Sequence, residues 1–186
     1  KDAVNESWTH LDHAGRFIRW AAMTAVMHQP VTQWQERALS EKNHNKRVVA
    51  LLALCKVVSA DPKNVTPEKP APKIDSALKA SIFKSLGQVD WSKLTHSSKL
   101  TLVRAYQIAL IRLGETNANV KNRIVQQLDP HFPAPNFEQN WLLCETLAYL
   151  QAPNTAAKGI RLLQDAATQE EQIEYARSLR MLKAGW

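Results

Sequence analysis

Residues 96–113 decide the fold, and they read HSSKLTLVRAYQIALIRL. Apolar side chains recur in this stretch every three or four residues, so an α-helix would place them on one side. Gly114 follows directly, and glycine is the residue that most often ends a helix. The pattern therefore predicts a helix over residues 96–113. Its inward positions are Leu102, Ala105, Tyr106, Ala109 and Leu113.

The same spacing recurs on both sides of this segment and predicts about nine short helices. Proline and glycine separate them, and polar residues stand where N-caps are needed. Thr168 has Glu171 three residues later, which is the capping-box spacing. Other predicted caps are Asp12, Thr32, Asn136 and Asn154. The other predicted helices cover residues 13–28, a segment through Trp34 and Leu39, 48–58, 73–86 and 117–128, and segments through Trp141, Ile160 and Leu179.

Residues 60–73 interrupt the helical pattern with four prolines. Closely spaced prolines forbid a continuous helix and favour extended chain. This stretch is long for a loop in a compact repeat protein, so it either crosses the surface or separates two subdomains. We favour a loop that crosses the surface.

Paired helices at intervals of about 35–45 residues are typical of stacked antiparallel hairpins. The sequence therefore predicts an all-α fold: an α-solenoid of HEAT-like or armadillo-like helix pairs in a single domain over residues 1–186. A compact orthogonal bundle is the alternative, because the pairs share little internal identity. The chain also begins and ends abruptly at Lys1 and Trp186, so we expect a fragment of a larger protein.

The composition, with 45% hydrophobic and 22% charged residues, excludes a disordered chain. No apolar run approaches the roughly 20 residues that span a bilayer, so no membrane insertion is expected. Residues 1–5 show no apolar signal segment, which leaves the localisation open.

The sequence contains no Gly-rich phosphate loop, no nucleophile elbow and no zinc-protease motif, so we predict no enzyme and no catalytic residue. His10, Asp12 and His13 lack a further ligand at metal spacing, and we expect no metal and no cofactor. Cys55 and Cys144 lie among apolar residues and are predicted to be buried free thiols. A disulfide between them is left open, because its geometry cannot be derived from the sequence.

The net charge of +7 is the strongest functional signal, since a basic surface attracts phosphates, anionic polymers or acidic proteins. We expect most of these basic residues to lie on ordinary solvated helix faces. We interpret Trp20, Trp34 and Trp141 as core residues. Tryptophans outside clear apolar stripes are candidate exposed anchors: Trp8, Trp91 and Trp186. The predicted interaction surface is Lys158, Arg161, Arg177, Arg180, Lys183 and Trp91, with further basic residues at Arg104, Arg112, Lys121 and Arg123.

Residues 12–22, DHAGRFIRWAA, resemble a HEAT-type helix, in which Asp precedes a run of hydrophobic, Arg and Ala residues. Residues 29–31, 34–39 and 128–135 (LDPHFPAP) are similar to stretches of large exported bacterial proteins. In that family, HEAT-like repeats join a β-propeller resembling sugar dehydrogenases to a cytochrome c domain. The resemblance implies a linking or docking role and a periplasmic or exported location. It transfers neither haem nor dehydrogenase residues, because Cys-x-x-Cys-His and the propeller are missing here.

Two functional hypotheses follow. The favoured one is a non-catalytic scaffold that binds a protein, or neighbouring domains of the same polypeptide, and possesses no cofactor. The alternative is a nucleic-acid-binding protein resembling the HEAT-like alkylpurine DNA glycosylases, which combine a basic concave surface with tryptophans and a carboxylate. No residue of this chain is matched to the site of that family.

Overall fold

The computed structural model describes residues 2–184 and confirms the predicted all-α class. Within that range the regular elements are ten α-helices and four short 3-10 helices, and no strand occurs. The additional α-helix is α1 (Asp2–Thr9), which the sequence analysis missed. Only two of its residues, Val4 and Trp8, are buried, so it lacks the longer periodic stripe by which the others were found.

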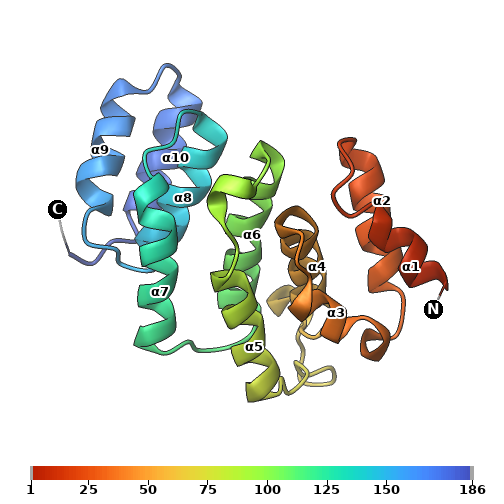
Figure 1. The fold of residues 1–186 in the computed structure, drawn as a ribbon. Coiled ribbons are helices and arrows are strands. Elements are labelled where there is room, and N and C mark those ends of the chain that lie inside the picture. Colours follow the sequence, from red (N-terminus) through yellow and green to blue (C-terminus); the bar gives the residue numbers. More distant parts are fainter. Residues whose placement is uncertain (1, 185–186) are drawn as a thin grey trace. The chain divides into compact units, whose positions relative to one another are not determined.

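The chain divides into two compact units, Lys1–Glu115 and Thr116–Trp186 (Figure 1). The single domain over 1–186 and the α-solenoid of HEAT-like or armadillo-like pairs stay predictions. Unit 1 contains α1, α2 (Arg16–Met27), α3 (Gln35–Ser40), α4 (His44–Val57), α5 (Ser76–Gly87) and α6 (His96–Arg112). Unit 2 contains α7 (Ala118–Leu128), α8 (Phe137–Tyr149), α9 (Thr155–Asp165) and α10 (Gln169–Leu179).

Helix α4 is the centre of unit 1. It packs against α2, α3, α5 and, most extensively, α6. Leu51, Leu54 and Cys55 are fully buried, and apolar residues occur around most of the helix, as expected for a helix with neighbours on several sides. The Asn43 side chain accepts hydrogen bonds from the backbone N–H groups of Asn45 and Lys46, which caps the first turn.

The end of α6 confirms the role predicted for Gly114. This glycine has φ +81°, a left-handed conformation that side chains other than glycine rarely adopt. The Lys79 ammonium group on α5 donates to the carbonyl oxygens of Gly114 and Glu115. These bonds place a positive charge beside the negative end of the helix.

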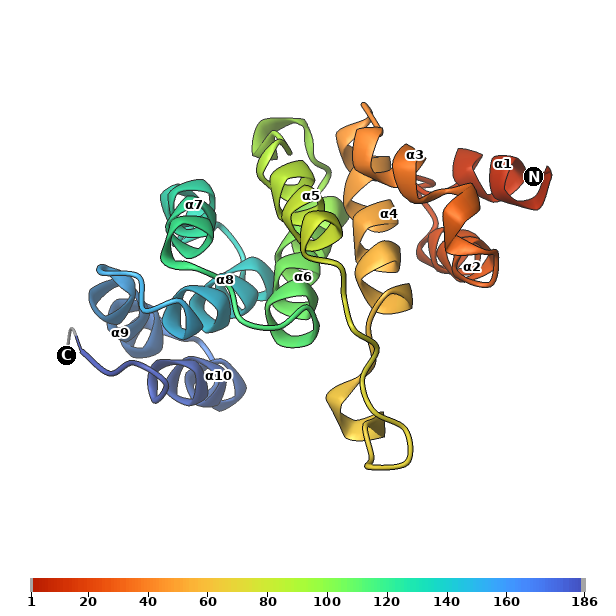
Figure 2. The same cartoon turned by 90° about the horizontal axis from the view of Figure 1, so that it is seen from below.

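The segment between α4 and α5 is an extended loop, as predicted, but it projects from unit 1 instead of crossing its surface as we favoured (Figure 2). Its regular structure is one 3-10 turn, Pro62–Asn64, which the Asp61 carboxylate caps through the backbone N–H of Lys63. Farther along, Thr66 and Lys69 exchange two backbone hydrogen bonds of 3.1 Å each. The loop is therefore locally ordered by its own contacts.

In unit 2, α10 packs against both α8 and α9, and the core lies along α8. Leu143, Cys144 and Leu147 of α8 are fully buried. Gly159 on α9 allows the close approach of α10, because a Cβ atom at that position would lie 2.7 Å from Cδ2 of Leu179. A side chain at residue 159 would have to displace Leu179.

The predicted N-caps have mixed outcomes. Asn136 and Thr168 are confirmed, since their side chains accept from the backbone N–H groups of Gln139 and Glu171. Asn154 precedes α9 but makes no capping hydrogen bond. Thr32 was wrong, because it lies within a 3-10 turn, Val31–Gln33, that precedes α3.

Asp12 was also wrong as a cap. Gly15 is the N-cap residue of α2 and provides no side chain for the role. The Asp12 carboxylate instead accepts a 2.9 Å hydrogen bond from Asn43 Nδ2 and lies 3.7 Å from Lys46 Nζ. Its partners therefore lie at the start of α4. The Asp12 side chain makes this tertiary contact and not the capping hydrogen bond that was predicted.

Candidate functional site

The outward side of α2 exposes several large apolar side chains. Exposed fractions are 81% for Phe17, 62% for Trp20 and 46% for Ile18. Ala21 and Ala25 are exposed beside them. We call these five residues the α2 outer face. Soluble proteins rarely leave neighbouring large apolar side chains in water, and such patches mark binding surfaces.

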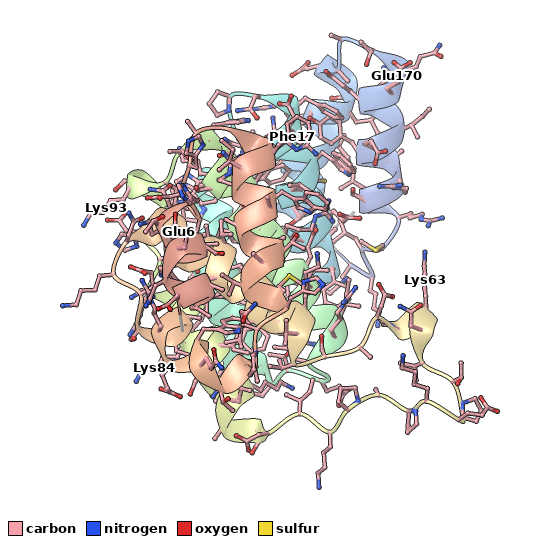
Figure 3. All side chains as sticks on the ribbon, turned by 90° about the vertical axis from the view of Figure 1, so that its right-hand side faces the viewer. Glu6, Phe17, Lys63, Lys84, Lys93 and Glu170 are labelled. Carbon is pink, nitrogen blue, oxygen red and sulfur yellow. The ribbon has the colours of Figure 1, made fainter. Side chains whose placement is uncertain are left out.

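The inner side of the same helix anchors it to the unit. Ala22, Met23 and Val26 are buried, and α2 packs against α1 and α4. The helix is thus apolar on two sides, and only one side is covered within unit 1. Figure 3 views the molecule from the side on which α2 lies and labels Phe17 near the start of this helix.

Positive charge borders the start of the α2 outer face. Arg16 is exposed, and Arg19 Nη1 donates to the carbonyl oxygens of His13 at 2.7 Å and Ala14 at 2.8 Å. Helix α2 contains no acidic residue. These contacts hold the Arg19 guanidinium at the residues that precede the helix, and exposed Arg16 lies one turn before Trp20, so the start of the apolar face has a cationic border.

Two sequence interpretations were wrong here. Phe17 and Trp20 belong to the stripe used to predict this helix, and Trp20 was interpreted as a core residue. Both are exposed. The three-to-four-residue spacing is satisfied equally by the opposite stripe of Ala22, Met23 and Val26, and the packing against α1 and α4 uses that one. Periodicity finds a helix but cannot choose between two apolar sides.

Trp8, predicted as an exposed anchor, is buried, with 1% of its surface exposed. Its indole Nε1 donates to Glu41 Oε2 at 2.7 Å, and the Arg37 guanidinium lies 4.5 Å from the ring centroid. Burial raises the pKa of the Glu41 carboxyl. Hydrogen bonds from Trp8 and from the backbone N–H groups of Asn43 and Lys42, together with the charge of Lys46, lower that pKa, and the net pKa is below its usual value.

The remaining tryptophans divide as follows. Trp34 is buried, which confirms its core assignment, whereas Trp141 is half-buried. Trp91 is also half-buried, and Lys99 Nζ lies 5.5 Å from its ring centroid. Trp186 lies outside the described residues.

The residues of the predicted basic surface fall in different places. Lys158 Nζ forms an ion pair of 2.7 Å with Asp129, and Arg177 lies 2.6 Å from a Glu174 carboxylate oxygen. Arg161, Arg180 and Lys183 are exposed on unit 2, whereas Trp91 belongs to unit 1.

The positive charge of the chain is unevenly divided between the two units. Unit 2 contains 7 Lys and Arg residues against 7 Asp and Glu residues, so it is neutral. Unit 1 contains 17 basic against 10 acidic residues and therefore carries the entire excess of +7. Of the further basic residues, Arg104 and Arg112 lie in unit 1 and Lys121 and Arg123 in unit 2.

The histidines near the N-terminus are not arranged as a metal site. The His10 and His13 rings lie 6.1 Å apart, and His10 Nε2 is 3.5 Å from Glu6. No group of three or more His, Cys, Asp or Glu residues within 2–184 is placed to hold a metal ion. No helix in that range is long and apolar enough to cross a membrane.

Cys55 and Cys144 are buried and free, as predicted. Burial raises the pKa of each thiol to about 12. For Cys144 the charge of Glu145 adds to this effect. The thiolate is the reactive form, so both groups are protonated and unreactive near neutral pH.

Comparison with known proteins identifies no relative. No protein-family model, curated protein or solved structure matches this chain. The resemblance to HEAT-like regions of exported bacterial proteins therefore remains a prediction from residues 12–22, 29–31, 34–39 and 128–135.

Proposed function

We propose that this chain is a non-catalytic protein-interaction domain, and that the α2 outer face binds an amphipathic helix. The observation that carries the proposal is the exposure of Phe17 and Trp20 on a helix whose other side is already packed. Aromatic side chains provide much of the binding energy in protein interfaces. Their positions three residues apart present both rings to one partner.

Burial of these rings offers enough free energy to matter. Covering a large apolar side chain contributes about 1.5–3 kcal/mol, so Phe17 and Trp20 together offer roughly 3–6 kcal/mol before the costs of association. A helix laid along α2 would contact both rings through residues at three-to-four-residue spacing. This partner geometry needs no change in the packed inner side.

The cationic border selects among such helices. Arg16 is exposed at the start of the face, Arg19 is held beside it, and unit 1 carries the whole net charge of the chain. Complementary charges around an apolar centre favour the correct partner and speed encounter. We therefore expect acidic residues flanking the apolar residues of the bound helix.

The proposed role also includes linking neighbouring domains. In stacked helical hairpins, each unit buries its apolar face against the next unit. An uncovered apolar helix face is suited to receive a helix from an adjoining domain of the same polypeptide. Together with the HEAT-like resemblance of residues 12–22, this supports a docking or spacing domain within an exported protein with redox domains.

A displayed library of helical peptides tests the proposal. Selection against the wild-type chain should enrich amphipathic helices with acidic flanks, and these should bind a Phe17→Ala, Trp20→Ala variant at least tenfold more weakly, which corresponds to about 1.4 kcal/mol. Ile111→Ala is the matched control, since Ile111 is 58% exposed on α6 of the same unit. Failure to enrich any peptide that distinguishes the double variant from wild type would reject the proposal.

Nucleic-acid binding is the second candidate, because the excess charge of unit 1 occurs together with exposed Trp20. An exposed indole beside arginine can stack on unpaired bases. Binding to single-stranded DNA that falls steeply with salt and is weakened by Trp20→Ala would favour this function. Binding no tighter than that of an equally basic helical protein would exclude it.

A further inference from the structure

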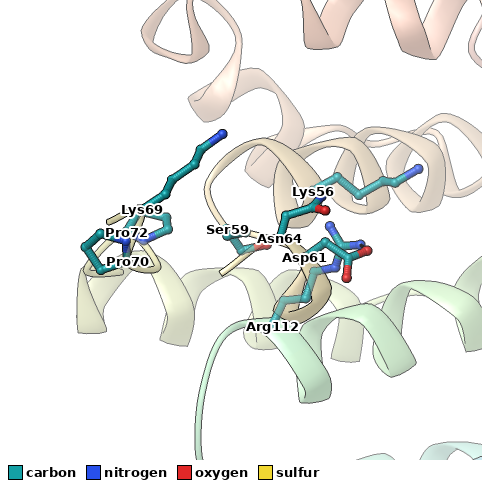
Figure 4. Close-up of a pocket in the computed structure, with 9 residues that line it drawn as sticks. Lys56, Ser59, Asp61, Asn64, Lys69, Pro70, Pro72 and Arg112 are labelled. Carbon is teal, nitrogen blue, oxygen red and sulfur yellow. Dashed lines mark hydrogen bonds and ion pairs between the residues drawn. The ribbon is translucent and has the colours of Figure 1, made fainter. Parts of the chain in front are cut away.

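Unit 1 contains a pocket that the protein-interaction proposal does not use. It has a volume of about 500 Å³ and lies where the proline-rich loop meets the last turns of α4 and α6. This volume is within the range of about 300–1,000 Å³ that is typical of small-molecule sites. Figure 4 shows Lys69, Pro70 and Pro72 on one side, and Lys56, Asp61 and Arg112 on the other.

Asp61 organises the inner side of this pocket. One carboxylate oxygen accepts from the backbone N–H of Lys63, and the other forms an ion pair with Arg112 Nη2. The Arg112 side chain is only 14% exposed, so its guanidinium is held in a nearly fixed position. Because both oxygens of Asp61 have partners, its carboxylate is poorly suited to receive a cation. Arg112 keeps further N–H donors.

The charge of the lining favours an anion. Lys56, Lys69 and Arg112 contribute three positive charges against the single negative charge of Asp61. Lys56 and Lys69 form no ion pair with any residue in the range 2–184. The lining as a whole therefore has an excess of two positive charges, and the rings of Pro70 and Pro72 add apolar contact area.

We propose that this pocket binds a small molecule bearing a phosphate group, with Lys56, Lys69 and Arg112 as the cationic ligands. A phosphate monoester carries up to two negative charges near neutral pH, which matches the excess of the lining. Guanidinium groups bind phosphate oxygens through directed N–H donors, and lysines add mobile point charges. The site is separate from the α2 outer face, so either proposal can fail without the other.

Calorimetric titration of the full chain with inorganic pyrophosphate, at constant ionic strength, tests the inference. Wild type should bind saturably, and Lys56→Gln with Lys69→Gln should weaken binding by about tenfold or more. Lys42→Gln with Lys84→Gln is the matched control, because both lysines are exposed in unit 1 and neither lines the pocket. The control pair should change affinity by less than about twofold.

Three results would overturn the inference. The first is no saturable binding up to about 10 mM, which would show that the pocket has no useful affinity. The second is an equal loss in the control variant, which would assign the binding to general charge. The third is equal affinity for citrate, which would show recognition of negative charge rather than of phosphate.

Discussion

Unit 1 and unit 2 are both helical, yet their surfaces differ. Unit 1 carries the whole net charge, the α2 outer face and the loop pocket, whereas unit 2 is neutral and pairs Lys158 and Arg177 within itself. The net charge of the whole chain therefore does not indicate where a binding surface lies. Basic residues clustered in sequence can be balanced by nearby acids, while an excess elsewhere is spread over many elements.

Core truncations should have the largest effects and should separate the units. Leu54→Ala in α4 and Leu147→Ala in α8 each remove a fully buried side chain, so each should lower the free energy of unfolding by about 2–5 kcal/mol. Hydrogen exchange would show where the loss occurs. Leu54→Ala should accelerate exchange mainly in unit 1, and Leu147→Ala mainly in unit 2. Equal acceleration in both units would show that they unfold as one.

Glycine substitutions sharpen the same comparison at intermediate size. Gly159→Ala should destabilise unit 2 by about 1–3 kcal/mol, because its Cβ would lie 2.7 Å from buried Leu179, less any gain in helix propensity. Gly87→Ala at the end of α5 should be neutral or slightly stabilising, since nothing lies within 4 Å of its Cβ. Thermal denaturation of both variants measures the contrast. A stabilising Gly159→Ala would contradict the packing of α9 on α10.

Acid sensitivity should differ between the units by a smaller amount. The pKa of Glu41 is lower in the folded state than in the unfolded state. The ionised carboxylate therefore adds to the free energy of unfolding above the unfolded pKa, and this stabilisation is lost as the pH falls through the folded pKa. The effect should be under about 1 kcal/mol, because the group is partly solvated. The free energy of unfolding, measured from pH 7 down to acidic pH, should decrease less for Glu41→Gln and for Trp8→Phe than for wild type.

Among the described residues of unit 2, Trp141 makes no equivalent contact. Trp141 Nε1 is buried and has no hydrogen-bond partner within residues 2–184. Trp141→Phe should therefore leave the acid dependence unchanged. An effect equal to that of Trp8→Phe would show that the indole–carboxylate hydrogen bond is not the cause.

Exposed apolar residues should give the smallest stability effects in either unit. Phe17→Ala, Trp20→Ala and, in unit 2, Ile173→Ala should each change the free energy of unfolding by about 0.5 kcal/mol or less, since these side chains are 62–81% exposed. Chemical denaturation measures these values. A loss above about 2 kcal/mol at Trp20 would mean that its ring is packed in solution, and the docking proposal would lose its basis.

Much of the fold was predictable because helix positions and helix ends depend on residues that are close together in sequence. The run at 96–113, Gly114 and the caps Asn136 and Thr168 depend on neighbours in sequence, and the structure confirms each of them. Asp12 was mispredicted because its partners lie about 30 residues away on α4. Capping rules that consider only residues close in sequence cannot predict such a contact.

The candidate site was harder to predict than the fold. Phe17 and Trp20 lie in a helix with two apolar sides, and only the packing on α1 and α4 decides which side is buried. Trp8 was missed for the opposite reason: it lies in a short polar helix, and the residues that contact its ring and indole N–H, Arg37 and Glu41, are distant in sequence. The sequence did not distinguish Arg112 from the other basic residues, because its partner Asp61 lies on the loop, far away in sequence.

Hydrogen exchange of the chain with and without a peptide from the helical library tests the central claim most directly. We expect protection in residues 16–27, where the α2 outer face lies, and none at 158–183, which contain all residues of the surface predicted from the sequence except Trp91. Protection confined to α9 and α10, with α2 unchanged, would contradict it and return the interaction surface to unit 2.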